Sequence, residues 1–262
     1  MYLLFEGGNA IPTSQPVDQH DIRTVVEIAR REMPQSLLKN LQADIGSAGF
    51  KSVPSGDIDL MIEAEDLVAL FKTQDDAKDP VLAAKKALAT YFAAKGIEAK
   101  VNGRNVSIGV KYNGTNGRQG YAQVDLMVIQ DVKIVAPWYQ HGPRGMYADP
   151  GFKGQQNFVL MSSIAKYLNL KFDPFGAKLV NRDTNEVVGR TRKEVAKILL
   201  GPAAKESDLD SVKSMVLALA KDPDREGKLA QAKQDQAKGL LTLPEDTAPG
   251  TAKWFRQWTD QL

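Results

Sequence analysis

Strict alternation of apolar and polar residues predicts three strands in the first half of the chain. In the stretch 56–64, one face carries Ile58, Leu60 and Ile62, and the other face carries Asp57, Asp59 and Met61. The stretches 105–112 and 121–129 show the same period of two, which is typical of strands with one buried face. The connection between them, Asn-Gly-Thr-Asn-Gly, predicts a hairpin with a loop longer than two residues.

Helical periodicity accounts for most of the other predicted elements. An Ala- and Lys-rich amphipathic helix is expected over 80–95, where Gly96 ends it. The same period over 21–41 predicts a helix that Pro34 breaks or kinks. Thr191 followed by Glu194 is a capping-box pattern. The other expected elements are a short strand over 43–47, helices over 155–168, 191–200, 208–220, 224–240 and 251–262, and a small hairpin over 178–188.

This order of elements indicates an α+β fold that has two parts. Strands and helices mix in the first half, and the texture changes after Ile134, where prolines, glycines and aromatic residues gather. We therefore predict a first domain over 1–135, a linker over 136–154 and a mainly helical domain over 155–262.

Composition restricts the class of protein without naming a partner. The chain has 262 residues, of which 43% are hydrophobic and 25% charged, as in an ordinary soluble protein. It contains no cysteine, which excludes disulfides and thiolate metal sites. Residues 1–9 lack the pattern of a secretory signal, and no apolar run approaches the roughly 20 residues that span a bilayer. We expect a cytoplasmic location and no membrane partner.

Charge adds little at the level of the whole chain. The formal net charge is +2, which is smaller than the basic excess of many dedicated nucleic-acid binders. Local basic clusters could still bind phosphate, and Lys153 and Arg192 are candidates for this role.

Two aspartates on the first strand suggest metal chemistry. Asp57 and Asp59 are two residues apart, so their side chains point to the same face of the strand. Two carboxylates on one face repel each other unless a cation lies between them. Hard oxygen ligands of this kind suit Mg²⁺, which proteins often hold with one or two carboxylates and the phosphates of a substrate.

A glycine–serine pair and a third aspartate complete the candidate site. Gly46 allows close approach of the backbone to a phosphate, and Ser47 offers a hydroxyl and an N–H group. Asp125 is a charged residue in an otherwise apolar strand, where it needs a partner or a purpose. If its strand neighbours that of Asp59, three carboxylates could serve two metal ions in a displacement at phosphorus.

This combination resembles the signature of the DNA polymerase β-type nucleotidyltransferase superfamily. The resemblance rests on Gly46-Ser47, the spacer, the motif Asp57-Ile58-Asp59 and the later Asp125, and it covers about residues 41–130. It implies a nucleotidyltransferase-like mixed sheet with flanking helices. It also implies that two Mg²⁺ ions bind the three aspartates, that Asp125 helps to activate the acceptor hydroxyl, and that Gly46 and Ser47 contact the triphosphate.

One position departs from the family pattern. Minimal members often carry an arginine shortly after the Gly-Ser turn, whereas this chain has Lys51, which offers a point charge without a bidentate fork. Ser55, in the loop before the aspartates, is a further candidate for nucleotide binding. The segment Phe5-Glu6-Gly7-Gly8-Asn9 resembles the start of nucleotidyltransferase-like proteins carried by bacteriophages, which would place the protein in the host cytoplasm.

The expected reaction is transfer of a nucleoside monophosphate from an NTP to an acceptor hydroxyl, with release of pyrophosphate. The preferred acceptor is an RNA 3′ end of the tRNA kind. Two alternatives stay open: a toxin- or antitoxin-like nucleotidyltransferase that modifies a protein or small molecule, and a nucleotide-binding module without catalysis. The sequence indicates no oligomeric state.

Overall fold

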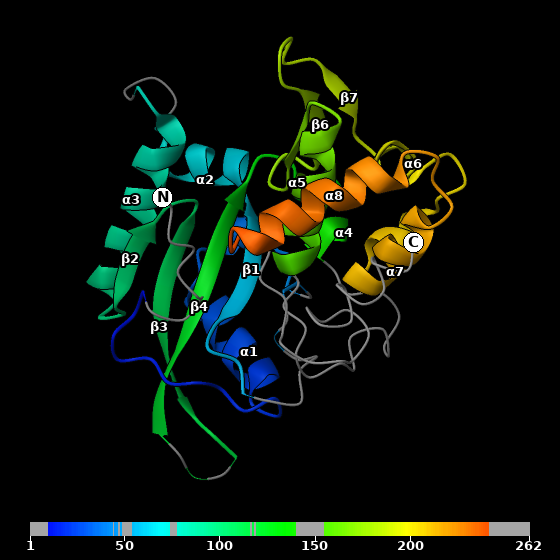
Figure 1. Cartoon of the computed structure of the whole chain (residues 1–262). Coiled ribbons are helices and arrows are strands. Elements are labelled where there is room, and N and C mark those ends of the chain that lie inside the picture. Colours follow the sequence, from blue (N-terminus) through cyan, green and yellow to red (C-terminus); the bar gives the residue numbers. More distant parts are fainter. Residues whose placement is uncertain are drawn as a thin grey trace. The chain divides into compact units, whose positions relative to one another are not determined.

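The chain divides into two compact units, Met1–Gln140 and His141–Leu262, which are described separately. The structure is a computed structural model, shown in Figure 1. It describes residues 10–43, 45–46, 48, 54–73, 78–115, 117, 119–139 and 155–240.

The first unit contains a mixed four-stranded sheet. Its strands are β1 (Ile58–Glu63), β2 (Ala99–Asn102), β3 (Asn105–Asn113) and β4 (Gln119–Ile129). Their order across the sheet is β1-β4-β3-β2, with β1 parallel to β4 and the other pairs antiparallel. The hairpin predicted between the second and third alternating stretches is confirmed as the β3–β4 connection. Strand β4 also pairs with β1, so the first and the third of the alternating stretches are neighbours in the sheet.

Helices cover one face of this sheet. They are α1 (Ile22–Glu32), α2 (Ala64–Phe71) and α3 (Pro80–Ala94). Aliphatic residues at alternate positions of β1, β3 and β4 pack with the buried sides of these helices in one hydrophobic cluster. The residues that the sheet contributes include Ile58, Leu60, Ile62, Val106, Ile108, Val110, Val124, Leu126 and Val128. The alternation seen in the sequence therefore reports the core-facing side correctly.

The opposite face of the sheet carries the residues between these aliphatic positions. It is polar where Asp59 and Asp125 lie, and it becomes apolar two residues further on, at the buried side chains of Met61 and Met127. Helix α4 (Val132–Tyr139) packs against β1. Because α4 continues to Tyr139, the first four residues of the expected linker are helical.

The second unit combines helices with a small sheet. Strands β5 (Leu170–Asp173), β6 (Lys178–Asn181) and β7 (Val187–Gly189) form a three-stranded antiparallel sheet, which confirms the expected hairpin and adds β5 to it. Thr191 and Glu194 form the predicted capping box at the start of α6 (Arg192–Leu200). The elements are α5 (Gln155–Tyr167), β5 (Leu170–Asp173), β6 (Lys178–Asn181), β7 (Val187–Gly189), α6 (Arg192–Leu200), α7 (Val212–Leu219) and α8 (Arg225–Ala237).

Several predicted elements have different limits in the structure. Helix α1 ends at Glu32, before Pro34, and a short 3-10 turn follows it, so the break at the proline is confirmed. The short strand expected over 43–47 is wrong for the residues of that range that are described. Gln42 instead forms an isolated antiparallel bridge with Met61. Residues 251–262, where a helix was expected, lie outside the described residues.

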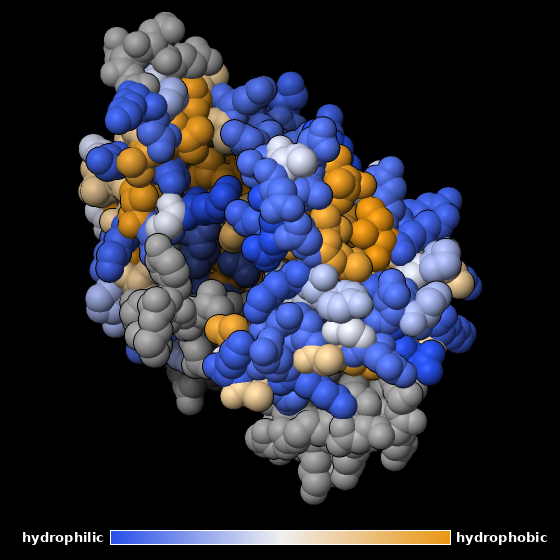
Figure 2. Space-filling model, turned by 45° about the horizontal axis from the view of Figure 1, so that its top comes forward, coloured by the Kyte–Doolittle hydropathy of each residue, from blue (hydrophilic) through white to orange (hydrophobic). Residues whose placement is uncertain are grey.

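The visible surface is mostly hydrophilic, with smaller hydrophobic patches (Figure 2). Within the described ranges, no helix combines the length and apolar character that crossing a bilayer requires.

Candidate active site on the polar face of the sheet

Asp59 and Asp125 lie side by side on neighbouring strands. Strands β1 and β4 are parallel, and their register pairs the Cα atoms of these two residues. Neighbouring strands are about 4.8 Å apart, and paired residues point to the same face. Asp125 is 6% exposed and Asp59 is partly exposed. The neighbourhood that the third carboxylate required is therefore present.

Asp57 precedes β1 by one residue and flanks the same face. Ile58, between the two aspartates, is buried in the helix-covered core, so Asp57 and Asp59 belong to the other side of the strand. The hydroxyl of Ser55 donates a 2.9 Å hydrogen bond to the carbonyl oxygen of Asp57. Ser55 is fully buried, and its backbone pairs with that of Val17. Ser55 thus fixes the backbone just before β1, and its predicted contact with a nucleotide stays a prediction.

Gly46 lies directly against the carboxylate of Asp59. Its φ angle is +71°, in the left-handed region that favours glycine. A Cβ atom at this position would be 2.5 Å from Oδ2 of Asp59, which is shorter than any normal contact. The N–H group of Gly46 donates a 3.2 Å hydrogen bond to the carbonyl oxygen of Tyr139, at the end of α4. Gly46, which was predicted to contact phosphate, thus lies beside Asp59.

Polar side chains surround the carboxylate of Asp125. Gln123 donates a 3.0 Å hydrogen bond to Oδ1, and Asn105 donates one of 3.3 Å to Oδ2. Ser107 lies opposite Asp125 in the β3–β4 register and is fully buried. The hydroxyl of Ser107 has no hydrogen-bond partner among the described residues. Both oxygens of Asp125 are therefore oriented by neutral donors.

The donor set matches a hard divalent cation in its chemistry. Asp59 and Asp125 share one face at the same end of two neighbouring strands, Asp57 lies just before β1, and carboxylate oxygens suit Mg²⁺. The described residues, which include these three aspartates, contain no gathered group of three acidic or histidine side chains that could hold a metal ion. Joint binding of a metal by Asp57, Asp59 and Asp125 therefore stays a prediction.

The other residues singled out from the sequence are either outside the described residues or in the second unit. Ser47, Lys51 and Lys153 lie outside the described residues, so their predicted contacts with phosphate stay predictions. Arg192 forms an ion pair with Asp210 inside the second unit, where both side chains are mostly buried. Burial raises the pKa of Asp210, against the opposing effect of the arginine. Arg192 is thus part of the packing of its own unit.

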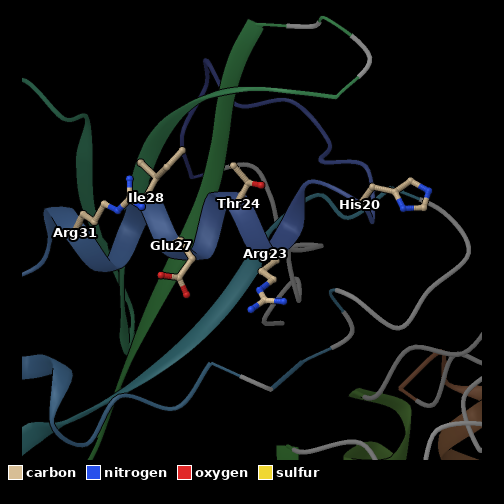
Figure 3. Close-up of a pocket in the computed structure, with 6 residues that line it drawn as sticks. All are labelled: His20, Arg23, Thr24, Glu27, Ile28 and Arg31. Carbon is tan, nitrogen blue, oxygen red and sulfur yellow. The ribbon is translucent and has the colours of Figure 1, made fainter.

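A shallow depression on the solvent side of α1 carries basic side chains (Figure 3). Arg30, which is partly exposed, pairs with Glu27 at 3.8 Å. Because α1 covers the apolar face of the sheet, this depression belongs to the side opposite Asp59 and Asp125, and we do not assign it to the candidate site. It is lined by His20, Arg23, Thr24, Glu27, Ile28 and Arg31.

Sequence reasoning missed Gln123 and Asn105. The sequence did hold a signal for Gln123, because it lies two positions before Asp125 and so on the same face of the strand, whereas the neighbouring positions 122 and 124 are apolar. Asn105 carried none, since a polar residue at the start of a strand is ordinary. No family model matches the chain, and no curated protein is significantly similar to it.

Proposed function

We propose that the protein is a nucleotidyltransferase that moves a nucleoside monophosphate from an NTP to an acceptor hydroxyl and releases pyrophosphate. The observation that carries the proposal is the register of β1 and β4, which pairs Asp59 with Asp125 on one face. The close approach of Gly46 to Asp59 supports it, because a phosphate-binding turn must lie beside the metal-binding carboxylates.

Each of these residues has its own proposed role. Asp57, Asp59 and Asp125 would hold two Mg²⁺ ions. The ions supply charge stabilisation for the attacking and leaving oxygens. Asp125, which receives hydrogen bonds from Gln123 and Asn105, orients the acceptor hydroxyl and accepts its proton. The turn at Gly46 and Ser47 holds the triphosphate, so catalysis is mainly positioning and electrostatic stabilisation.

As the acceptor we propose the hydroxyl of an RNA 3′ end. The support is the resemblance of Gly46-Ser47, Asp57-Ile58-Asp59 and Asp125 to a superfamily that includes RNA-tailing enzymes. One assay can test both the type of reaction and the identity of the acceptor.

The test is nucleotide transfer by the whole chain. The protein is incubated with each α-labelled NTP, Mg²⁺ and either total RNA or a protein lysate, and label is followed on both. We expect label on RNA, and we expect Asp125→Asn to lower the rate by about 10²–10³-fold, the loss typical of removing one electrostatic element. The control is Glu65→Gln, which removes an exposed carboxylate on α2.

Each outcome decides one part of the proposal. Label on protein would keep the reaction and replace the acceptor. NTP binding without transfer to any acceptor, unaffected by Asp125→Asn, would contradict the catalytic proposal and favour a nucleotide-binding module.

A further inference from the structure

A buried glutamine joins Asp125 to the segment that precedes the first helix. Gln123 is 1% exposed and lies on the same face of β4 as Asp125. Its Nε2 group donates the 3.0 Å hydrogen bond to Oδ1 of Asp125. Its Oε1 atom accepts hydrogen bonds of 2.9 Å and 3.1 Å from the backbone N–H groups of Ala10 and Ile11.

These three hydrogen bonds fix the orientation of the carboxamide of Gln123. Two backbone N–H groups require an oxygen acceptor, so the NH₂ group must face the carboxylate of Asp125. Rotating the amide by half a turn would place oxygen against oxygen on one side and N–H against N–H on the other. All of the polar contacts of this buried group therefore support one arrangement.

Packing holds the segment of Ala10 and Ile11 on the same face. Ile11 is 1% exposed, and a Cβ atom on Gly109 would lie 3.1 Å from its Cγ2 atom. Gly109 is the β3 residue that pairs with Gln123 in the register. A glycine at that point leaves the space that Ile11 occupies. The backbone of the segment and the amide of Gln123 are thus brought together by the sheet itself.

We propose that Gln123 is a positioning residue, which sets the carboxylate of Asp125 according to the docking of Ala10 and Ile11. This inference rests on the proposed function, since it assigns Asp125 a role at the metal. Groups that orient a ligating carboxylate commonly change metal affinity or activity by about 10–100-fold when they are replaced. Gln123 therefore couples the packing of the N-terminal segment to the reaction without touching the substrate.

Gln123→Glu separates the two contacts of the side chain. It keeps an oxygen for the N–H groups of Ala10 and Ile11, but at a pH where its carboxyl group is ionised it turns the donor that faces Asp125 into an acceptor. We expect kcat to fall about 10–100-fold while the KM for NTP changes by less than about threefold. Amide hydrogen exchange at Ala10 and Ile11 stays as slow as in the wild type. The matched control is Gln119→Glu, an exposed glutamine on the same strand.

In Gln123→Met the new side chain has a similar length, but it can bond neither to Asp125 nor to the N–H groups of Ala10 and Ile11. We expect kcat to fall at least as far, and hydrogen exchange at Ala10 and Ile11 to quicken about tenfold or more, because two buried donors lose their acceptor. An unchanged kcat in Gln123→Glu, with slow exchange at both amides, would overturn the positioning role. It would mean that the glutamine only anchors the segment.

A measurement without turnover keeps this inference separate from the proposed function. The side-chain NH₂ resonances of Gln123 are assigned by NMR in the full chain from their loss in the variants. We expect them to shift when Asp125 is replaced by asparagine and to stay in place in Gln119→Glu. Resonances that do not respond to Asp125→Asn would overturn the contact. A shift in a protein that transfers no nucleotide would leave the contact standing and reject the reaction.

Discussion

The two faces of the first sheet put neighbouring residues to different uses. Leu126 and Asp125 are consecutive in β4, yet Leu126 is fully buried in the helix-covered cluster and Asp125 belongs to the polar face. The same holds for Leu60 and Asp59 in β1. Because strand side chains alternate, one sheet separates stability from chemistry at the level of single positions. Substitutions at consecutive positions should therefore produce different kinds of failure.

The largest expected effect comes from Leu126→Ala on the apolar face. Deleting a buried leucine side chain leaves a cavity, and we expect the free energy of unfolding of the first unit to fall by about 2–5 kcal/mol. Urea unfolding measures this loss. The comparison variant is Asp125→Asn, where we expect a change within about 1 kcal/mol, because the amide oxygen still accepts one hydrogen bond. Equal destabilisation by the two variants would contradict the division between the faces.

A smaller effect is expected from Gly46→Ala at the edge of the polar face. An alanine at a positive φ costs about 1–2 kcal/mol of stability, and its Cβ atom would also displace the carboxylate of Asp59. The control is Gly96→Ala, whose φ is +75° but whose Cβ atom would meet nothing within 4 Å. We expect similar losses of stability in chemical denaturation, and a loss of transfer rate of about tenfold or more only in Gly46→Ala. If Gly46→Ala transferred nucleotide as fast as Gly96→Ala, Gly46 would have no role in the proposed site.

The smallest effect concerns Glu63, a carboxylate at the far end of β1. Burial raises the pKa of Glu63, and the nearby acidic residues Asp131, Asp66 and Glu65 add to this, whereas the N–H group of Val132 opposes it. The folded state then binds the proton more tightly than the unfolded state. Stability therefore falls as the pH rises from about 4.5, the ordinary value, through the raised pKa of the folded state.

Glu63→Gln should remove that dependence. We expect the free energy of unfolding at pH 7 to rise by less than about 1 kcal/mol, because water screens the partly exposed carboxylate. Its slope against pH above 4.5 should become flatter, and the transfer rate should be unchanged. Unfolding by urea at several pH values measures the slope. A steeper slope in the variant would contradict the assigned cause of the pKa shift.

The sequence predicts what depends on local periodicity. The strands that carry Asp59 and Asp125, the helix over Pro80–Ala94 and the capping box at Thr191 all follow from the spacing of neighbouring residues. Helix α2 was missed, because it begins directly after β1, with Glu63 as its N-cap and no side-chain cap hydrogen bond. Strand β2 was also missed, because its four residues are too few to show a clear alternation of apolar and polar positions.

What the sequence could not supply is the long-range pairing. The chain travels 66 positions from Asp59 to Asp125, and only the parallel register of β1 and β4 makes them neighbours. The hydrogen bonds between Gln123 and the backbone of Ala10 and Ile11 join residues that are more than 110 positions apart in the chain. No local pattern encodes contacts at such separations.

The most direct test of the proposed metal site is a crystal structure with Mn²⁺ and an NTP analogue that cannot be cleaved between its α- and β-phosphates. We expect anomalous density for metal at Asp57, Asp59 and Asp125, with the triphosphate extending toward the turn at Gly46. Metal and nucleotide bound elsewhere, with Asp125 still held only by Gln123 and Asn105, would contradict it.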